Sequence, residues 1–567
     1  MGRYTISVST GDRKNAGTDA GVYIKLFDRN GGSTGTLELD NFFKNDFEKG
    51  QTDTFIIDNN PTFLEEISSI ELWREDKGLA DSWFVDSITA QCECSNDVFV
   101  FPIHRWIKEN KHYIINLLDI SLPQFDENGV LRSDALREKR KLYELEEKLP
   151  GLPMQVKVLP EDESFSFDYQ WDITKQKIGL IATSKIVLLT SGRWDSVDDI
   201  RNVYTKEIFV EPRVIRDYDS DVTLGVTEEM LKPFLEGLSL QEALSRKRIF
   251  ITDFEIMKDL PTREGYVVCA PIGLFFANNK DDLLPIAIQL YQDKANDNPV
   301  FLPSDPKYTW QMAKIRALEK LISPDGWINN TMNEGVAGLL ELVKRAFADW
   351  KLNVQGTLPE DLKERGMLNE DGPVLKNYHF SEDALLLYNI PKNWQVIGKF
   401  SNGEMHYQVQ FQTRNWGVPG ENGKFQTLDD LIITLTCIVY TCSVGHAAAN
   451  FQQYDMYGYP PAYPAYMAGR PPTNKDPLTE ADIMNALPDK PTTLDIMIVT
   501  KILSTKGTKS LGDFEVQYIV DPQALKIVEE FKEDLKAAGK TIEQLNNERN
   551  RPYEYLVPEN IPNAISI

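Results

Sequence analysis

The stretch YTISVSTGDRKNAGTDAGVYIKLFD, residues Tyr4–Asp28, contains the pattern that decides the fold of the first part of the chain. Apolar and polar residues alternate in its two flanks, which is the period-two pattern of a half-buried β-strand. Between the flanks lies a loop containing glycine and acidic residues, a composition that interrupts regular structure. The stretch therefore predicts a strand, a loop and a second strand.

The same alternation recurs as far as about residue 115, in the segments TDTFIID, SIELWRE, WFVDSITA and DVFVFPI. Turn clusters rich in Gly, Asp and Asn separate these segments, and several short strands at such spacing predict an antiparallel β-sandwich. After about residue 125 the pattern changes to amphipathic helical segments such as MNEGVAGLLELVKRAFADW. We therefore expect a β-sandwich domain over residues 1–115 and a large, mainly α-helical domain over residues 116–567.

Composition limits the classes of function. A chain of 567 residues with 42% hydrophobic residues is globular and too long for a single core. Its net charge of −25 argues against general nucleic-acid binding, which requires a basic face that displaces counterions. The same charge argues against simple electrostatic docking on anionic lipid. A membrane role would need calcium bridging or inserted apolar side chains.

Cysteines and apolar runs indicate a cytoplasmic protein. The five cysteines do not form the framework of a small secreted domain, and Cys92 and Cys94 are too close for an ordinary zinc pair. The first residues lack the apolar core of a signal peptide. The longest apolar run, LIITLTCIVYTC, has about 12 residues, whereas a membrane span needs roughly 18. We expect this run to be a buried core helix.

Two loops of the predicted sandwich carry the chemistry of a calcium site. Calcium prefers clustered oxygen ligands, and Asp19, Asn45, Asp46 and Glu48 would converge if the loops lie at one end of the sandwich. The large apolar residues Phe42 and Phe43, with Leu79 near another turn, are candidates for membrane insertion. The alternative is that the acids form a solvated loop surface while the phenylalanines fold back onto the core.

A histidine in the segment TCSVGHAAANF, residues 441–451, is the second candidate site. On a helix, His446 and Asn450 share one face because they are four residues apart. Non-haem iron typically binds two histidines and a carboxylate, so His446 is either an iron ligand or a core histidine with satisfied hydrogen bonds. These residues alone leave both interpretations open.

The chain resembles the animal lipoxygenases, particularly the coral enzymes, at both ends. TGDRKNAGTDAGVYIKLFD, LELDNFFKNDFEKGQTDTF and WFVDSI are similar to their N-terminal PLAT domain. IVYTCSVGHAAANFQQYDMYGYPPAYPAYMAGRPP and the final VPENIPNAISI are similar to the lipoxygenase segments that carry iron ligands. The resemblance implies the calcium ligands Gly17, Thr18, Asp19, Asn45, Asp46 and Glu48, and the iron ligands His446, Asn450 and the terminal carboxylate of Ile567.

The resemblance also implies an activity. A family member would use non-haem iron and molecular oxygen to convert a polyunsaturated fatty acid, such as arachidonate, into a hydroperoxide. Its PLAT domain would bind calcium and attach the otherwise cytoplasmic protein reversibly to a membrane surface.

One departure from the family concerns the iron site. In the family, the segment equivalent to WQMAK, residues 310–314, leads into a helix with two iron histidines five residues apart. Here it runs into IRALEKLISPDGW, and no His-x4-His exists in the chain. The chain is therefore either a degenerate paralogue or an incomplete version of a full enzyme; the persistence of the other ligands favours the second. The alternative function is that of a catalytically inactive homologue acting as a calcium-dependent lipid-binding protein.

Overall fold

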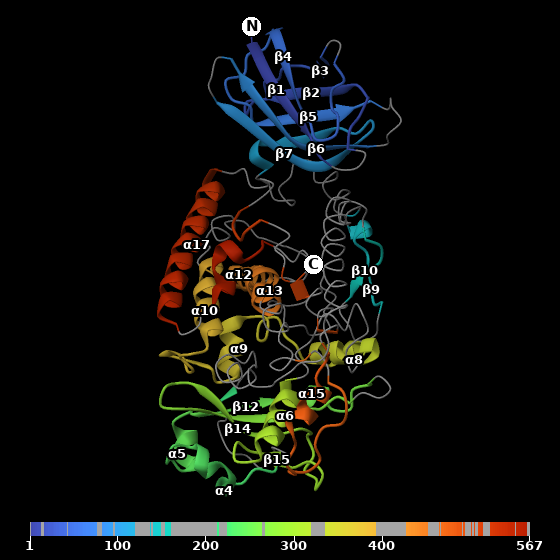
Figure 1. Ribbon diagram of the computed structural model, residues 1–567. Coiled ribbons are helices and arrows are strands. Elements are labelled where there is room, and N and C mark those ends of the chain that lie inside the picture. The colour runs from blue at the N-terminus through green and yellow to red at the C-terminus, as the bar shows by residue number, and fades with distance from the viewer. Residues whose placement is uncertain are drawn as a thin grey trace. The chain divides into compact units, whose positions relative to one another are not determined.

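The fold was analysed on a computed structural model of the 567-residue chain (Figure 1). The structure describes residues 2–12, 16–41, 44–75, 82–93, 97–119, 137, 140–148, 154–159, 213–214, 224–262, 267–318, 335–392, 427–451, 464, 467–489, 492–493, 500–501, 504, 509–513, 522–549 and 552–563. Contacts divide the chain into two compact units, residues 1–148, 154–165 and 516–529, and the remainder.

The N-terminal unit contains the predicted β-sandwich. Its strands are β1 Gly2–Thr10, β2 Val22–Phe27, β3 Leu37–Leu39, β4 Thr52–Asn60, β5 Ser69–Arg74, β6 Ser82–Cys92, β7 Val98–Lys108 and β8 Tyr113–Asn116, followed by η1 Leu117–Asp119. They form two antiparallel four-stranded sheets with the orders β4-β1-β6-β7 and β3-β2-β5-β8. Figure 1 shows these strands in blue. The sandwich predicted from the alternating segments is confirmed.

Alternation along the strands builds the sandwich core. In β2 every second residue is buried, and β5 shows the same alternation. Because successive side chains of a strand point to opposite faces, this places one apolar row of each strand between the sheets. Trp83, Tyr4 and Phe55 are among the largest fully buried side chains of that core.

The second unit contains a sheet that the sequence analysis did not predict. Its five strands are β11 Arg213–Val214, β12 Ile249–Asp253, β13 Ile272–Ala277, β14 Leu283–Gln289 and β15 Val300–Phe301, in that spatial order. Every residue of β13 is buried. A strand covered on both faces has a continuous apolar sequence, so the alternation that identifies a half-buried strand is missing.

Along the chain, helices lie between the strands of this sheet and after them. The described helices are α4 Glu228–Leu231, η4 Lys232–Phe234, α5 Leu240–Ser245, η5 Glu255–Met257, α6 Lys307–Leu318, α8 Gly335–Ala348, α9 Leu358–Glu364, α10 His379–Lys392, α12 Leu428–Tyr440, η6 Thr441–Gly445, α13 His446–Asn450, α15 Glu480–Ala486, α17 Pro522–Glu548, η7 Glu554–Leu556 and η8 Pro558–Asn560. Short strand pairs are β9 Leu145–Glu146 with β10 Gln155–Val156 and β16 Leu368–Asn369 with β17 Gly372–Pro373. One core cluster joins residues of α9, α10, α13, α17 and η7.

The apolar run near residue 440 belongs to a helix longer than predicted. The helical segment Asp429–Asn450 has 22 residues and a mean hydropathy of 1.7, and 39% of it is buried. Length and composition would let it cross a membrane, but core helices of soluble proteins meet the same criteria. Val444, Ala447 and Ala448 of this segment lie in the core cluster with α17 and η7.

The cysteines differ in one respect from the expectation. Cys92, at the end of β6, is disulfide-bonded. Cys269, Cys437 and Cys442 are not disulfide-bonded. The expectation rested on the number and spacing of the cysteines. These do not show whether the Cβ atoms of two cysteines lie close enough for a disulfide bond.

Candidate functional site

The two sandwich loops predicted to bind calcium lie against each other. The Thr18 backbone N–H donates to the Phe47 carbonyl oxygen at 3.3 Å. A Cβ atom on Gly17 would lie 3.0 Å from the same oxygen and 3.6 Å from the Glu48 Cα, so only glycine permits this approach without a shift. The Gly17–Asp19 and Asn45–Glu48 segments are therefore brought together, as predicted.

The predicted calcium ligands differ in their availability. Asp19 is exposed, and the Asn45 side-chain amide donates to the Glu48 carboxylate. Asp46 is 8% exposed, and its two carboxylate oxygens accept hydrogen bonds from the backbone N–H and side-chain amide of Asn41, at 2.7 and 3.0 Å. Both Asp46 oxygens are therefore already hydrogen-bonded within their own loop. Carboxylate, amide and carbonyl oxygens are the donor types that calcium prefers, but the described residues contain no group of three or more His, Cys, Asp or Glu side chains placed to hold an ion.

An ion pair that the sequence analysis missed lies beside these ligands. The Lys44 Nζ is 2.5 Å from Asp53 Oδ1, and the Asp53 carboxylate is fully buried. The hydrogen bond to Asp53 raises the pKa of Lys44 above its usual value. The other Asp53 oxygen accepts the Phe47 backbone N–H at 2.7 Å. Asp53 lies within a predicted strand, and alternation alone gives no signal for a buried acid there.

The structure does not test the residues that the sequence predicts to insert into a membrane. Phe42, Phe43 and Leu79 lie outside the described residues. Their role stays a prediction that rests on their sequence positions in the loops.

The helix that carries His446 begins with a reciprocal cap. Thr427 Oγ1 accepts the Asp430 backbone N–H at 3.1 Å, and the Asp430 carboxylate accepts the Thr427 N–H at 2.8 Å. This capping box satisfies two backbone donors at the start of α12. A π-helical turn, η6, directly precedes His446. Single π-turns inserted into α-helices are frequent at functional sites.

His446 and Asn450 meet on one helix face, as predicted. The Asn450 Nδ2 atom lies 2.7 Å from His446 Nε2. The contact is made either by the amide donating to Nε2, with the ring proton on Nδ1, or by a protonated Nε2 donating to the amide oxygen, because the tautomer and the amide orientation set the roles. His446 Nδ1 is buried and has no hydrogen-bond partner. Burial lowers the pKa of His446, so the neutral imidazole is favoured.

The C-terminal segment packs beside this pair. Helix η7 contacts α13, and Leu556 and Ile561 share a core cluster with Ala447. The Ser504 hydroxyl also donates to the Asn450 carbonyl oxygen at 3.0 Å. The chain approaching its last residue is thus anchored near His446. Ile567 itself lies outside the described residues.

The other histidines have separate environments. His104 and His112 belong to the sandwich unit, where His104 Nδ1 is 3.8 Å from Asp86 and His112 Nδ1 is 2.8 Å from Glu71. His379 begins α10 beside Arg549, and His406 lies outside the described residues. At most one further histidine therefore remains for a site at His446.

The described residues do not assemble a complete iron site around His446. The described residues contain no group of three or more His, Cys, Asp or Glu side chains that could hold a metal ion. Selective binding of non-haem iron normally needs two histidines and a carboxylate around open positions. His446 with Asn450 supplies one imidazole, and that imidazole is already hydrogen-bonded.

A buried ion network joins the helices of this unit. The Arg549 side chain is 5% exposed and donates to the fully buried Asp383 carboxylate at 2.6 and 2.8 Å, and to Glu382 at 2.9 Å. Asn546 Oδ1 accepts from Arg549 and from the Tyr553 backbone N–H. The network connects α10 to α17 and fixes the start of the C-terminal segment. We interpret the network as structural, because its described carboxylates are already paired with Arg549.

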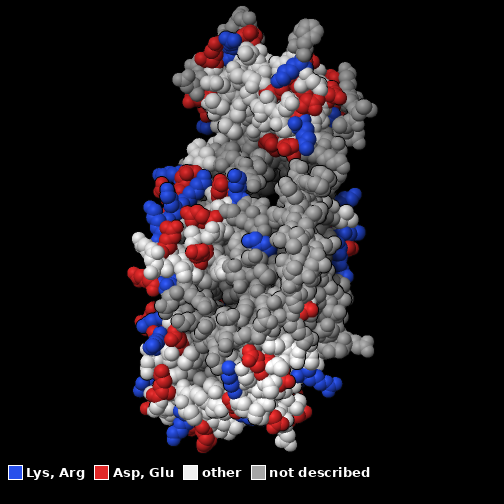
Figure 2. All heavy atoms as spheres, viewed as in Figure 1, with Lys and Arg blue, Asp and Glu red and all other residues white. Residues whose placement is uncertain are grey.

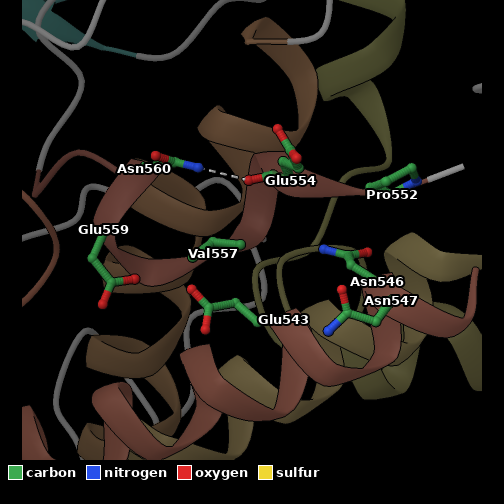
Figure 3. A pocket seen from close by; sticks show the side chains of 8 residues that line it. All are labelled: Glu543, Asn546, Asn547, Pro552, Glu554, Val557, Glu559 and Asn560. Carbon is green, nitrogen blue, oxygen red and sulfur yellow. Dashed lines mark hydrogen bonds between the residues drawn. The ribbon is translucent and has the colours of Figure 1, made fainter.

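A cavity of about 700 Å³ lies between α17 and the C-terminal turns (Figure 3). Its lining is polar: Glu543, Asn546, Asn547, Pro552, Glu554, Val557, Glu559 and Asn560. Figure 3 shows the Glu543 carboxylate directed toward the space between α17 and the η7–η8 segment. Fatty acids require predominantly apolar linings, so this cavity is not a fatty-acid channel. Figure 2 shows acidic and basic side chains interspersed on the visible face of the described residues, without a continuous basic patch.

Comparison with known proteins identifies both parts of the chain. The PLAT/LH2 domain family matches residues 4–118, and the lipoxygenase family matches residues 210–320 and 420–558. The protein is thus a lipoxygenase homologue with an N-terminal PLAT domain.

Its relatives are coral and mammalian lipoxygenases. The chain is 25% identical to the allene oxide synthase-lipoxygenase protein of Plexaura homomalla, covering all of this chain and 65% of that protein. It is 24% identical to the polyunsaturated fatty acid lipoxygenase ALOX15 of Bos taurus, over the full length of both. The crystal structure of coral 8R-lipoxygenase, described as activated by calcium through a C2-like domain, has the same fold, with a TM-score of 0.81, 23% identity and full coverage of both chains.

The comparisons also locate where this chain departs from its relatives. The alignment with the Bos taurus protein extends over 694 positions, more than the 567 residues of this chain. The lipoxygenase match is interrupted between residues 320 and 420. The interruption begins close to the point where the WQMAK segment would lead into the histidine helix. The absence of that helix stays a prediction.

Proposed function

We propose that this protein is a non-catalytic PLAT–lipoxygenase homologue that binds polyunsaturated fatty acids of the arachidonate type at membrane surfaces. The substrate class follows from the family, whose members include polyunsaturated fatty acid lipoxygenases. The observation that carries the non-catalytic assignment is that the sequence has no His-x4-His pair and that the described residues contain no group of three or more His, Cys, Asp or Glu side chains that could hold a metal ion.

Calcium would recruit the protein to the membrane through the PLAT loops. Oxygen atoms of Gly17, Thr18, Asp19, Asn45, Asp46 and Glu48 would hold the ion, which supplies positive charge between acidic loops and anionic headgroups. The contact of the two loops through Thr18 and Phe47 supports this role. The aromatic residues Phe42 and Phe43, which lie in the same loop sequence, would then enter the interface.

Liposome co-sedimentation tests the recruitment. We expect the protein to sediment with phosphatidylcholine–phosphatidylserine vesicles in calcium and to stay in solution with chelator. A Phe42→Ala/Phe43→Ala variant should sediment several-fold less, while Phe63→Ala, at an exposed position elsewhere in the sandwich unit, should match wild type. Equal sedimentation of the double variant and wild type would remove the insertion role.

The second candidate is the family's dioxygenation of polyunsaturated fatty acids to hydroperoxides with molecular oxygen. It is favoured by the retention of His446 and Asn450 on one face, with the C-terminal segment packed beside them. Iron would supply the redox chemistry of such a reaction. The described residues do not provide its ligand set, so no step is assigned to this chain.

Metal analysis with activity and binding assays separates the two candidates. We expect iron far below one atom per chain, no conjugated-diene product from arachidonate, and retained binding of radiolabelled arachidonate. A His446→Phe variant should bind the fatty acid as wild type does. Stoichiometric iron with diene formation would instead establish the enzyme, and absence of fatty-acid binding would refute the lipid-binding assignment.

A further inference from the structure

The loop from Asn41 to Gln51 contains a lysine, Lys44, whose ammonium group lies beside two acidic side chains. Lys44 Nζ contacts Asp53 Oδ1 at 2.5 Å and lies 3.9 Å from Asp46 Oδ1. The two carboxylates are 0% and 5% exposed, whereas the Lys44 side chain is half-exposed. One ammonium group therefore neutralises two acids that are withdrawn from water. An unpaired buried carboxylate would be strongly unfavourable.

This pair determines the backbone between two predicted calcium ligands. Asp53 Oδ2 accepts the N–H of Phe47, the residue between Asp46 and Glu48. Phe47 has a φ of 62°, which is uncommon for a residue with a Cβ atom. Its ring packs against Phe55 and Trp83 in the core, with centroid separations of 5.4 and 5.0 Å. The ion pair and the aromatic contacts together hold this conformation.

The second lysine of the loop has a different environment. Lys49 contacts Asp12 at 3.2 Å, and both side chains are exposed at 53% and 82%. Solvent screens such a pair, so its contribution is small. Lys49 is therefore a matched control for Lys44, because it has the same charge in the same loop without a buried partner.

We propose that Lys44 is the resident cation of this loop, ordering the Asp46–Glu48 segment without a metal and competing with calcium for the buried carboxylates. The competition with calcium rests on the calcium-binding role proposed above, whereas the ordering of the Asp46–Glu48 segment by Lys44 does not. Lys44 is a positioning residue that acts through Asp53 and Asp46. Calcium that approaches Asp46 meets an ammonium group already 3.9 Å away, so the lysine sets the calcium affinity.

Calcium titration of the full chain by calorimetry tests the competition. We expect Lys44→Met to bind calcium about tenfold more tightly than wild type, because a positive charge next to the ligands is removed. Lys44→Arg, which keeps the charge, should retain the wild-type affinity, and Lys49→Met should differ from wild type by less than about threefold. Equal gains for Lys44→Met and Lys49→Met would overturn the proposal, because the effect would then be one of net charge.

Thermal unfolding separates this proposal from the calcium role itself. Without calcium, Lys44→Met should lower the melting temperature of the sandwich unit by about 5 °C. Adding Asp53→Asn should recover most of the loss, because no buried carboxylate is then left unpaired. A Lys44→Met loss that persists with Asp53→Asn would overturn the resident-cation assignment. If wild type and every variant fail to bind calcium while the recovery occurs, the calcium role is wrong and the ordering role of Lys44 is supported.

Discussion

At the scale of single residues, the histidines show how environment decides chemistry. The His446 ring lies within hydrogen-bonding distance of the Asn450 side chain, and burial lowers the pKa of His446. His379 is also partly buried, with Nδ1 lacking a partner, and burial with the nearby Arg549 guanidinium lowers its pKa to about 4. Both imidazoles are therefore neutral at pH 7. A neutral histidine is a competent metal ligand, but it needs partners, and the described residues contain no group of three or more such side chains.

His379 should make the stability of the protein depend on pH. Its folded pKa is lower than its unfolded value, so the unfolded state takes up a proton first as the pH falls. Its contribution to stability is thus complete above about pH 6.5 and is lost as the pH falls toward 4. Between pH 7 and pH 5, wild type should lose about 1 kcal/mol more unfolding free energy than His379→Phe, a value reduced because solvent screens the partly exposed ring.

Urea denaturation at both pH values measures this difference. A His379→Phe variant with the wild-type pH dependence would show that protons reach His379 in the folded protein.

At the scale of elements, the helix from Leu428 to Asn450 connects local sequence to the site. The Thr427–Asp430 capping box fixes its beginning, and Val444, Ala447 and Ala448 anchor its end in the core. The π-turn changes the helical register immediately before His446. The start of this helix therefore depends on local hydrogen bonds, while its end depends on tertiary packing.

Removing the cap should loosen the first turn of α12. Thr427→Ala should cost about 1 kcal/mol, because the Asp430 N–H loses its acceptor. Hydrogen exchange should then be about fivefold faster for amides 428–432. Thr541→Ala is the control, since Thr541 is exposed within α17 and bonds only to a carbonyl of its own helix. Unchanged exchange at 428–432 would mean that packing alone holds the turn.

At the scale of the whole molecule, the described apolar residues form separate cores. The sandwich cluster takes its buried members from Tyr4 to Ile115 alone. The clusters of the second unit are built from residues 224–302 around the sheet and from residues 250–561 among the helices. A core that closes within one continuous segment does not need the rest of the chain in order to form.

The isolated segment 1–118 should therefore fold. We expect a cooperative thermal transition and a β-rich circular dichroism spectrum, because both sheets and their shared core are contained in it. A Trp83→Ala variant of the segment should lose about 3–5 kcal/mol, since Trp83 is fully buried. A segment without a cooperative transition would show that the sandwich requires the second unit.

The sequence alone determined the features that depend on local pattern. Alternation predicted the two sheets of the sandwich, and four-residue spacing predicted that His446 and Asn450 share a helix face. Composition of the loops predicted an oxygen-rich region, and the structure brings Gly17 and Thr18 to Phe47 and Glu48. The five-stranded sheet was missed, because strands buried on both faces have no alternation.

Only the tertiary structure decided which of these groups are free to act. Asp53 lies in a strand far from any motif, yet its burial gives Lys44 a partner and fixes Phe47. Asn450 was expected beside His446, and its side chain lies 2.7 Å from His446 Nε2. Local sequence sets the direction of each side chain, because that depends on the helix or strand period. Hydrogen-bond partners and burial depend on segments that are distant in the chain, so no local pattern reveals them.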